Sequence, residues 1–192
     1  MIKLRIYEYL LRNHKLEIFT ALISEKLKCS NMFVSKTIKE LIAKNIAYKD
    51  AKNSVKIINP FLLATYLAYS ENFPSPLFFE MPEYKDLIFI LNKTLYSITL
   101  DSAVEILNNK IPSKIYAYVD EDDVEHLFNY LNPLNKESGN CLIVFPQKSE
   151  FFTSFQSINE VLLANNYQIF IDLLRVNKIS AANKLLKDEN LF

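Results

Sequence analysis

The segment from residue 19 to residue 46, FTALISEKLKCSNMFVSKTIKELIAKNI, constrains the fold more than any other part of the chain. It contains two stretches whose apolar residues recur at helical spacing, joined by the residues KCS. The pattern predicts two helices connected by a tight turn, with Thr20 and Ser30 as their N-terminal caps. The side chains expected to face the core are Ile23 and Leu27 in the first helix, and Val34, Ile38, Leu41 and Ile42 in the second.

The opposite face of the second predicted helix is polar. It carries Asn31, Met32, Ser35, Lys36 and Lys39. Hydroxyl and amide groups near its N-terminal end suit the base edges of a DNA major groove, and lysines further along suit phosphates. Ser30 has two interpretations, because its hydroxyl can cap the helix or contact a base.

The flanking sequence extends this helix pair at both ends. Residues 2–12 predict a helix with Leu4, Tyr7, Leu10 and Leu11 on one face. Asn45 stands where a left-handed residue would end the second helix. Residues 46–50, 51–53 and 54–59 predict a strand, a turn and a strand, which together form a β-hairpin. Asn59 can then cap a further helix that has Pro60 at its first position.

This order of helices, turn and hairpin resembles the helix-turn-helix of winged-helix transcription regulators, over about residues 1–59. Cys29 stands where that family usually has a small buried aliphatic residue, and Asn45 where glycine is common. The resemblance implies binding to double-stranded DNA through the second helix and the hairpin, or wing. The candidate DNA-binding residues are Ser30, Asn31, Met32, Ser35, Lys36 and Lys39 of the helix and Lys49, Lys52 and Lys56 of the wing. Winged-helix domains also serve as protein-binding adaptors, so that alternative stays open.

The charge distribution favours the DNA-binding interpretation. Residues 1–59 carry twelve Lys or Arg against five Asp or Glu, a balance of +7, although the whole chain is formally neutral. Residues 60–192 carry the remaining ten bases and seventeen acids, a balance of −7. Such asymmetry indicates a nucleic-acid-binding end, while a lysine-rich solvated surface is the alternative explanation.

Composition and the positions of the prolines divide the chain into two predicted domains. The segment SENFPSP, residues 70–76, contains two prolines that cannot continue a helix. We therefore expect a DNA-binding domain over 1–73 and a mixed α/β domain over 77–192, an α+β fold as a whole. Cys29 and Cys141 lie in apolar patterns and are expected to be free and buried, and no apolar run is long enough to span a membrane. These features predict a soluble, cytoplasmic protein.

The second predicted domain combines strands in 77–79, 114–119 and 140–145 with helices in 80–93, 167–176 and 180–188. Three of its segments resemble the C-terminal domain of AbiE-type antitoxins of type IV toxin-antitoxin systems: YSITLDSAVEIL, YQIFIDLL and SAANKLL. The resemblance rests on Tyr96, Thr99, Gln168, Asp172 and Leu173, whereas Leu100 stands where the family commonly has glycine and Val104 where it often has alanine. It implies a nucleotidyltransferase-like toxin as protein partner. The domain is otherwise expected to mediate assembly, such as a homodimer.

The segment VDEDDVEH, residues 119–126, is the remaining chemical candidate. Its carboxylates and His126 follow a predicted strand and could hold a divalent metal. A helix start explains them better, because Asp120 can cap it and Glu121, Asp122 and Asp123 favour its positive dipole end. The chain has two histidines and one glycine, so zinc sites and Gly-rich phosphate loops are not indicated. We expect no enzyme, no cofactor and no metal site.

Overall fold

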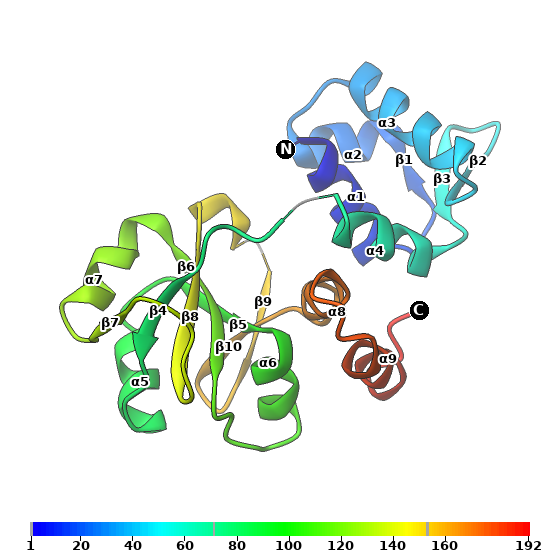
Figure 1. Cartoon of the computed structure of the whole chain (residues 1–192). Helices are drawn as coiled ribbons and strands as arrows, with labels where there is room; N and C mark the ends of the chain where they lie inside the picture. The colour runs from blue at the N-terminus through cyan, green and yellow to red at the C-terminus, as the bar shows by residue number, and fades with distance from the viewer. Residues whose placement is uncertain (1, 71, 153) are drawn as a thin grey trace. The chain divides into compact units, whose positions relative to one another are not determined.

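The computed structural model of the protein describes residues 2–70, 72–152 and 154–192 (Figure 1). The chain forms two compact units: Met1–Glu71 together with Phe192, and Asn72–Leu191. We call them the first and the second unit. Both contain helices and a β-sheet, so the fold is α+β as expected.

The first unit is built from short helices and a small sheet. Its elements in chain order are α1 (Ile2–Arg12), β1 (Ile18–Phe19), α2 (Thr20–Leu27), α3 (Asn31–Ala43), β2 (Ala47–Lys49), β3 (Ser54–Ile57) and α4 (Pro60–Ala68). The sheet has three antiparallel strands in the order β1-β3-β2. The predicted hairpin is confirmed, since Ala47 pairs with Ile57 and Lys49 with Val55. The strand β1 was not predicted.

The core of the first unit follows the apolar pattern closely. Ile6, Tyr7, Leu10, Leu11, Ile23, Val34, Ile38 and Leu41 are buried. Leu27 and Ile42, which were expected in the same core, are only half-buried. The caps of α4 are as predicted, because Asn59 accepts the Leu62 N–H at 2.9 Å and Pro60 is the first helical residue.

Two expectations for the turn region are wrong. Thr20 does not cap α2: Phe19 occupies the N-cap position without a side-chain hydrogen bond. The physical reason is that β1 runs directly into α2, so the Thr20 N–H pairs with the Asn53 carbonyl at the end of the sheet instead. Cys29 is half-buried, because Lys28 ends α2 in a left-handed conformation and the turn places residue 29 near the surface. Cys141 is buried as expected.

The second unit is organised around one mixed sheet. Its first elements are β4 (Leu77–Glu80), α5 (Tyr84–Leu91), β5 (Tyr96–Thr99), α6 (Leu100–Leu107), β6 (Ile115–Asp120), the 3₁₀ turn Glu121–Asp123 and α7 (Val124–Phe128). They are followed by β7 (Pro133–Leu134), β8 (Cys141–Gln147), the 3₁₀ turn Ser149–Phe151, β9 (Phe155–Ile158), β10 (Val161–Ala164), α8 (Asn166–Arg175) and α9 (Ile179–Asp188). The seven strands lie in the order β7-β4-β8-β6-β5-β10-β9.

The long strands β6 and β8 form the centre of this sheet. They run parallel, as β5 and β10 do, while the other neighbouring strands are antiparallel. Both central strands read as apolar runs because both of their faces are covered. None of the helices in the described parts of the chain has the length and apolar character that a bilayer span requires.

Candidate nucleic-acid interface

The helix α3 presents its polar face to solvent. Ser30 caps it as predicted: its Oγ accepts the Phe33 N–H at 3.2 Å. Val34, Ile38 and Leu41 are fully buried, which fixes the rotation of the helix on the core. The turns that start α3 therefore expose residues 31 and 32, and the Met32 side chain is 82% exposed.

The wing is held by an Asx-type turn. The Asp50 carboxylate accepts the Ser54 N–H at 2.8 Å and the Lys52 N–H at 2.9 Å. The Ser54 N–H is the main reason that the pKa of the Asp50 carboxyl is lowered. Asn53 completes the turn with a φ of 65°. One acidic side chain thus fixes the tip of the hairpin and points Lys52 into solvent.

The predicted DNA-binding residues lie on two adjacent elements, since α3 and the β2–β3 hairpin are side by side (Figure 1). Exposed are Ser30, Asn31, Met32, Lys36, Lys39, Lys52 and Lys56, while Ser35 and Lys49 are half-buried. Within residues 2–70, none of the five lysines in this set forms an ion pair with a carboxylate. Their charges are consequently available to an external anion.

Tyr48 is a surface residue of the wing that the sequence interpretation missed. Its side chain is 59% exposed, and it lies directly opposite Lys56 in the antiparallel pair β2–β3. Cross-strand neighbours share one face of a sheet. The alternation of buried Ala47 with exposed Tyr48 was the signal that could have identified it.

In the second unit, the polar residues that carry the antitoxin resemblance point inward instead. Asp172 of α8 is fully buried and accepts hydrogen bonds from Thr99 Oγ1 at 2.6 Å and from the Tyr118 hydroxyl and Gln168 Nε2, both at 2.9 Å. Arg175 adds an ion pair at 3.2 Å. Burial nevertheless raises the pKa of the Asp172 carboxyl to about 6, because desolvation outweighs the Arg175 charge and the hydrogen bonds. We call these five residues the Asp172 network.

The acidic segment after β6 has structural roles. Asp120 caps the 3₁₀ turn by accepting the Asp122 N–H at 3.0 Å, and Asp123 accepts the Leu95 N–H at 2.6 Å. Asp120 thus precedes a 3₁₀ turn that Glu121, Asp122 and Asp123 form, and α7 starts only at Val124. No group of three or more His, Cys, Asp or Glu side chains that could hold a metal occurs among the described residues.

No protein-family model, curated protein or solved structure matches this chain. The function is therefore inferred from the residues of the chain and from the geometry above.

Proposed function

We propose that the first unit is a winged helix-turn-helix domain that binds double-stranded DNA, and that the protein is a transcriptional regulator. The observation that carries the proposal is the exposed polar start of α3 beside a hairpin with lysines that have no ion-pair partner within residues 2–70. The net charge of +7 over residues 1–59 supports it.

The residues divide into two roles on DNA. Asn31 and Ser35 have side chains that can hydrogen-bond to base edges in a major groove. Ser30 Oγ already accepts the Phe33 N–H, so its hydroxyl proton and one remaining lone pair are left for a base. Lys36, Lys39, Lys49, Lys52 and Lys56 are assigned to phosphates, with Met32 as an apolar contact.

Salt-dependent binding of the full-length chain to duplex DNA tests this proposal. Counterion release requires that the logarithm of the affinity falls linearly with the logarithm of the salt concentration. We expect the double variant Lys52→Gln/Lys56→Gln to reduce the slope by roughly 2 and to weaken binding to all sequences alike. Fluorescence anisotropy of labelled duplexes measures both quantities. Lys85→Gln/Lys110→Gln is the control, because both of these lysines are exposed in the second unit.

Base readout needs a separate measurement. Selection of bound duplexes from a random pool gives the preferred sequence. Asn31→Ala should then relax the preference at one base pair by about 1 to 3 kcal/mol and leave the salt slope unchanged. Binding that is absent, or independent of salt, contradicts the proposal and favours the alternative, a winged-helix adaptor that acts without DNA.

For the second unit we propose binding to a protein partner, in the role of an antitoxin. Its support is the balance of −6 over residues 72–191, ten bases against sixteen acids, and an exposed aromatic patch. Phe89 is 64% exposed and Tyr130 54%, and the Lys93 ammonium lies 4.4 Å from the first ring centroid and 5.1 Å from the second. Exposed apolar surface of this kind is typical of protein-binding faces.

Co-expression with a nucleotidyltransferase-like protein encoded beside this gene tests that role. The antitoxin interpretation expects the two proteins to purify together and Phe89→Ser to weaken their complex. Phe155→Ser is the matched control, because Phe155 is also an exposed phenylalanine of the second unit but lies on β9. Absence of a complex contradicts the antitoxin role and leaves the DNA-binding proposal intact.

A further inference from the structure

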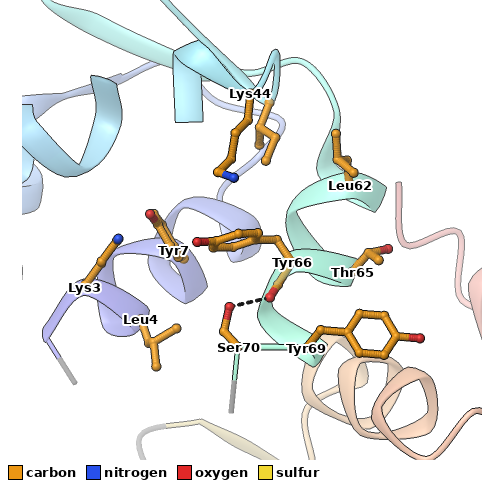
Figure 2. A pocket seen from close by; sticks show the side chains of 10 residues that line it. Lys3, Leu4, Tyr7, Lys44, Leu62, Thr65, Tyr66, Tyr69 and Ser70 are labelled. Atoms are coloured by element: carbon orange, nitrogen blue, oxygen red, sulfur yellow. Dashed lines mark hydrogen bonds between the residues drawn. The ribbon is translucent and has the colours of Figure 1, made fainter. Parts of the chain in front are cut away.

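The first unit contains a cavity that none of the proposed roles uses. It has a volume of about 850 Å³ and lies between α1, α4 and the residues that follow α3 (Figure 2). Its walls include Lys3, Tyr7, Lys44, Ile46, Leu62 and Tyr66. The volume falls within the range of about 300 to 1,000 Å³ that is usual for small-molecule sites.

Three tyrosines, Tyr7, Tyr66 and Tyr69, line the cavity, and the rings of the first two are in contact. Tyr7 and Tyr66 meet edge to face, with ring centroids 5.6 Å apart and an interplanar angle of 75°. Tyr7 is fully buried, and desolvation is the main reason that the pKa of its hydroxyl rises to about 12. The aromatic wall and the neutral phenol favour a flat apolar ligand.

Two lysines bring positive charge to the cavity, and they differ in whether a carboxylate pairs with them. Figure 2 shows the two rings between the ammonium groups of Lys3 and Lys44. Lys3 already forms an ion pair with Glu40 of α3. Lys44 lies 4.9 Å from the Tyr66 ring centroid, and no carboxylate in residues 2–70, 72–152 or 154–192 pairs with it. Among its described wall residues the cavity therefore has aromatic and aliphatic side chains, no acid, and Lys44 as a lysine without a carboxylate partner in the described parts of the chain.

We propose that this cavity binds a small, flat aromatic carboxylate. The ring would lie against Tyr66 with Leu62 and Ile46 around it, and the carboxylate would pair with the Lys44 ammonium. A neutral aromatic compound would leave Lys44 without a counterion, and a saturated acid would lose the contact with the rings. A dianionic group such as a phosphate needs a second free cation. Lys3 does not provide it, because Lys3 is already paired with Glu40.

Titration of the full-length chain with naphthalene carboxylate, followed by calorimetry, tests the site without DNA. We expect saturable binding of one molecule per chain. Naphthalene carboxamide, which has the same ring without the charge, and cyclohexane carboxylate, which has the charge without the ring, should each bind about tenfold more weakly.

Variants of single residues assign the binding to this cavity. Lys44→Met keeps an unbranched side chain but removes the charge, and it should weaken the carboxylate about tenfold while leaving the carboxamide unchanged. Tyr66→Leu should weaken both ligands. Lys15→Met, an exposed lysine outside the cavity wall, should change neither. Thermal unfolding by circular dichroism checks that each variant is folded, which the exposed position of Lys44 favours.

The proposal is overturned if naphthalene carboxylate shows no saturable binding. It is also overturned if the Lys44→Met variant binds naphthalene carboxylate as tightly as the wild type does. Because the titration contains no DNA, such a failure is distinguishable from a failure of the DNA-binding proposal.

Discussion

The two units use their polar side chains in opposite ways. In the first unit the polar residues that drew attention in the sequence, such as Asn31 and Lys36, are exposed on α3. In the second unit the corresponding residues are buried: Thr99 and Asp172 are 0% exposed and hydrogen-bonded to each other. The same kind of signal, a polar residue within an apolar pattern, thus marks a binding surface in one unit and internal architecture in the other.

This difference changes what the antitoxin resemblance means. All five residues that carry it are buried, and Tyr96 is typical: its hydroxyl donates to Asn92 at 2.8 Å and accepts the Leu162 N–H at 3.1 Å. Residues with such internal partners hold β5, β10 and α8 in place and cannot contact another protein directly. The resemblance therefore concerns the framework of the second unit, and partner contact must come from its exposed residues.

The largest expected effect comes from removing the centre of the Asp172 network. Asp172→Ala leaves the Arg175 charge and three buried donors without their acceptor. Breaking a buried, hydrogen-bonded ion pair on one side costs about 3 to 5 kcal/mol of unfolding free energy. Hydrogen exchange followed by mass spectrometry should show faster exchange in β5, β6 and α8 and unchanged exchange in α3.

The control is Asp188→Ala, which removes an exposed acid at the end of α9 and should change stability by less than about 0.5 kcal/mol. If Asp172→Ala left the second unit as stable as the wild type and only abolished partner binding, the network would belong to an interface and the contrast between the units would disappear.

The second expected effect is a pH dependence confined to the second unit. The pKa of Asp172 is about 6 in the folded protein and near 3.8 in the unfolded chain, so the native state binds the proton more tightly. Its contribution to stability is therefore complete below about pH 4, falls as the pH rises through about 6, and is constant above that. A difference of about 2 pKa units corresponds to roughly 3 kcal/mol.

Urea unfolding of the wild type and of Asp172→Asn between pH 4 and pH 7 measures this contribution. The difference in unfolding free energy between the two proteins should decrease with rising pH over that interval. A difference that increases with pH would mean that Arg175 and the hydrogen-bond donors outweigh desolvation. The acid would then behave like an ordinary stabilising ion pair.

The sequence predicted best what depends on local periodicity and worst what depends on distant segments. The Ser30 cap, the Asn59 cap and three of the four predicted core residues of α3 follow from a few neighbouring residues and are confirmed, whereas Ile42 is only half-buried. Strand β1 has only two residues and exists because it pairs with β3, so no local signal identifies it. The predictions for Thr20 and Cys29 are wrong for related reasons. β1 leads directly into α2, so Thr20 does not cap that helix, and the left-handed Lys28 places Cys29 near the surface.

The same limit of sequence-based prediction applies to the candidate nucleic-acid interface and to the cavity. The lysines of the wing could be found because charge is visible in composition. That Lys44 has no carboxylate partner among the described residues could not be found, because Glu40, four residues before it, pairs with Lys3 of a different helix. Asp172 lies in a mostly apolar helix, but its partners Thr99 and Tyr118 come from strands more than fifty residues earlier in the chain, which local sequence does not reveal.

A smaller effect concerns a left-handed residue of the second unit that is not an asparagine. Leu100 has a φ of 55° and is 2% exposed, so the second unit combines backbone strain with a buried side chain at the start of α6. Both Leu100→Ala and Leu100→Gly lose that burial. Only glycine also relieves the backbone strain. We therefore expect the Leu100→Gly variant to be more stable than the Leu100→Ala variant by about 1 kcal/mol.

Thermal or urea unfolding of the two variants measures this difference. Ala103, in the same helix, is the matched control, because Ala103→Gly should destabilise by about 1 kcal/mol in the usual helical order of preference. An alanine variant at position 100 that is more stable than the glycine variant would mean that the left-handed geometry carries no strain there.

The smallest expected effect concerns Asn45, one of three left-handed residues described in the first unit, with Lys28 and Asn53. Asn45 has a φ of 56°, as its place after α3 predicted, and it is exposed. Asparagine tolerates this conformation well, so Asn45→Gly should be neutral or stabilising by a few tenths of a kcal/mol. Ala43→Gly, within α3, should instead destabilise by about 1 kcal/mol. Urea unfolding measures both. A loss of unfolding free energy well above 1 kcal/mol for Asn45→Gly would mean that the Asn45 side chain makes a stabilising contact. The first unit would then depend on a specific side chain at position 45, as the second unit depends on Leu100.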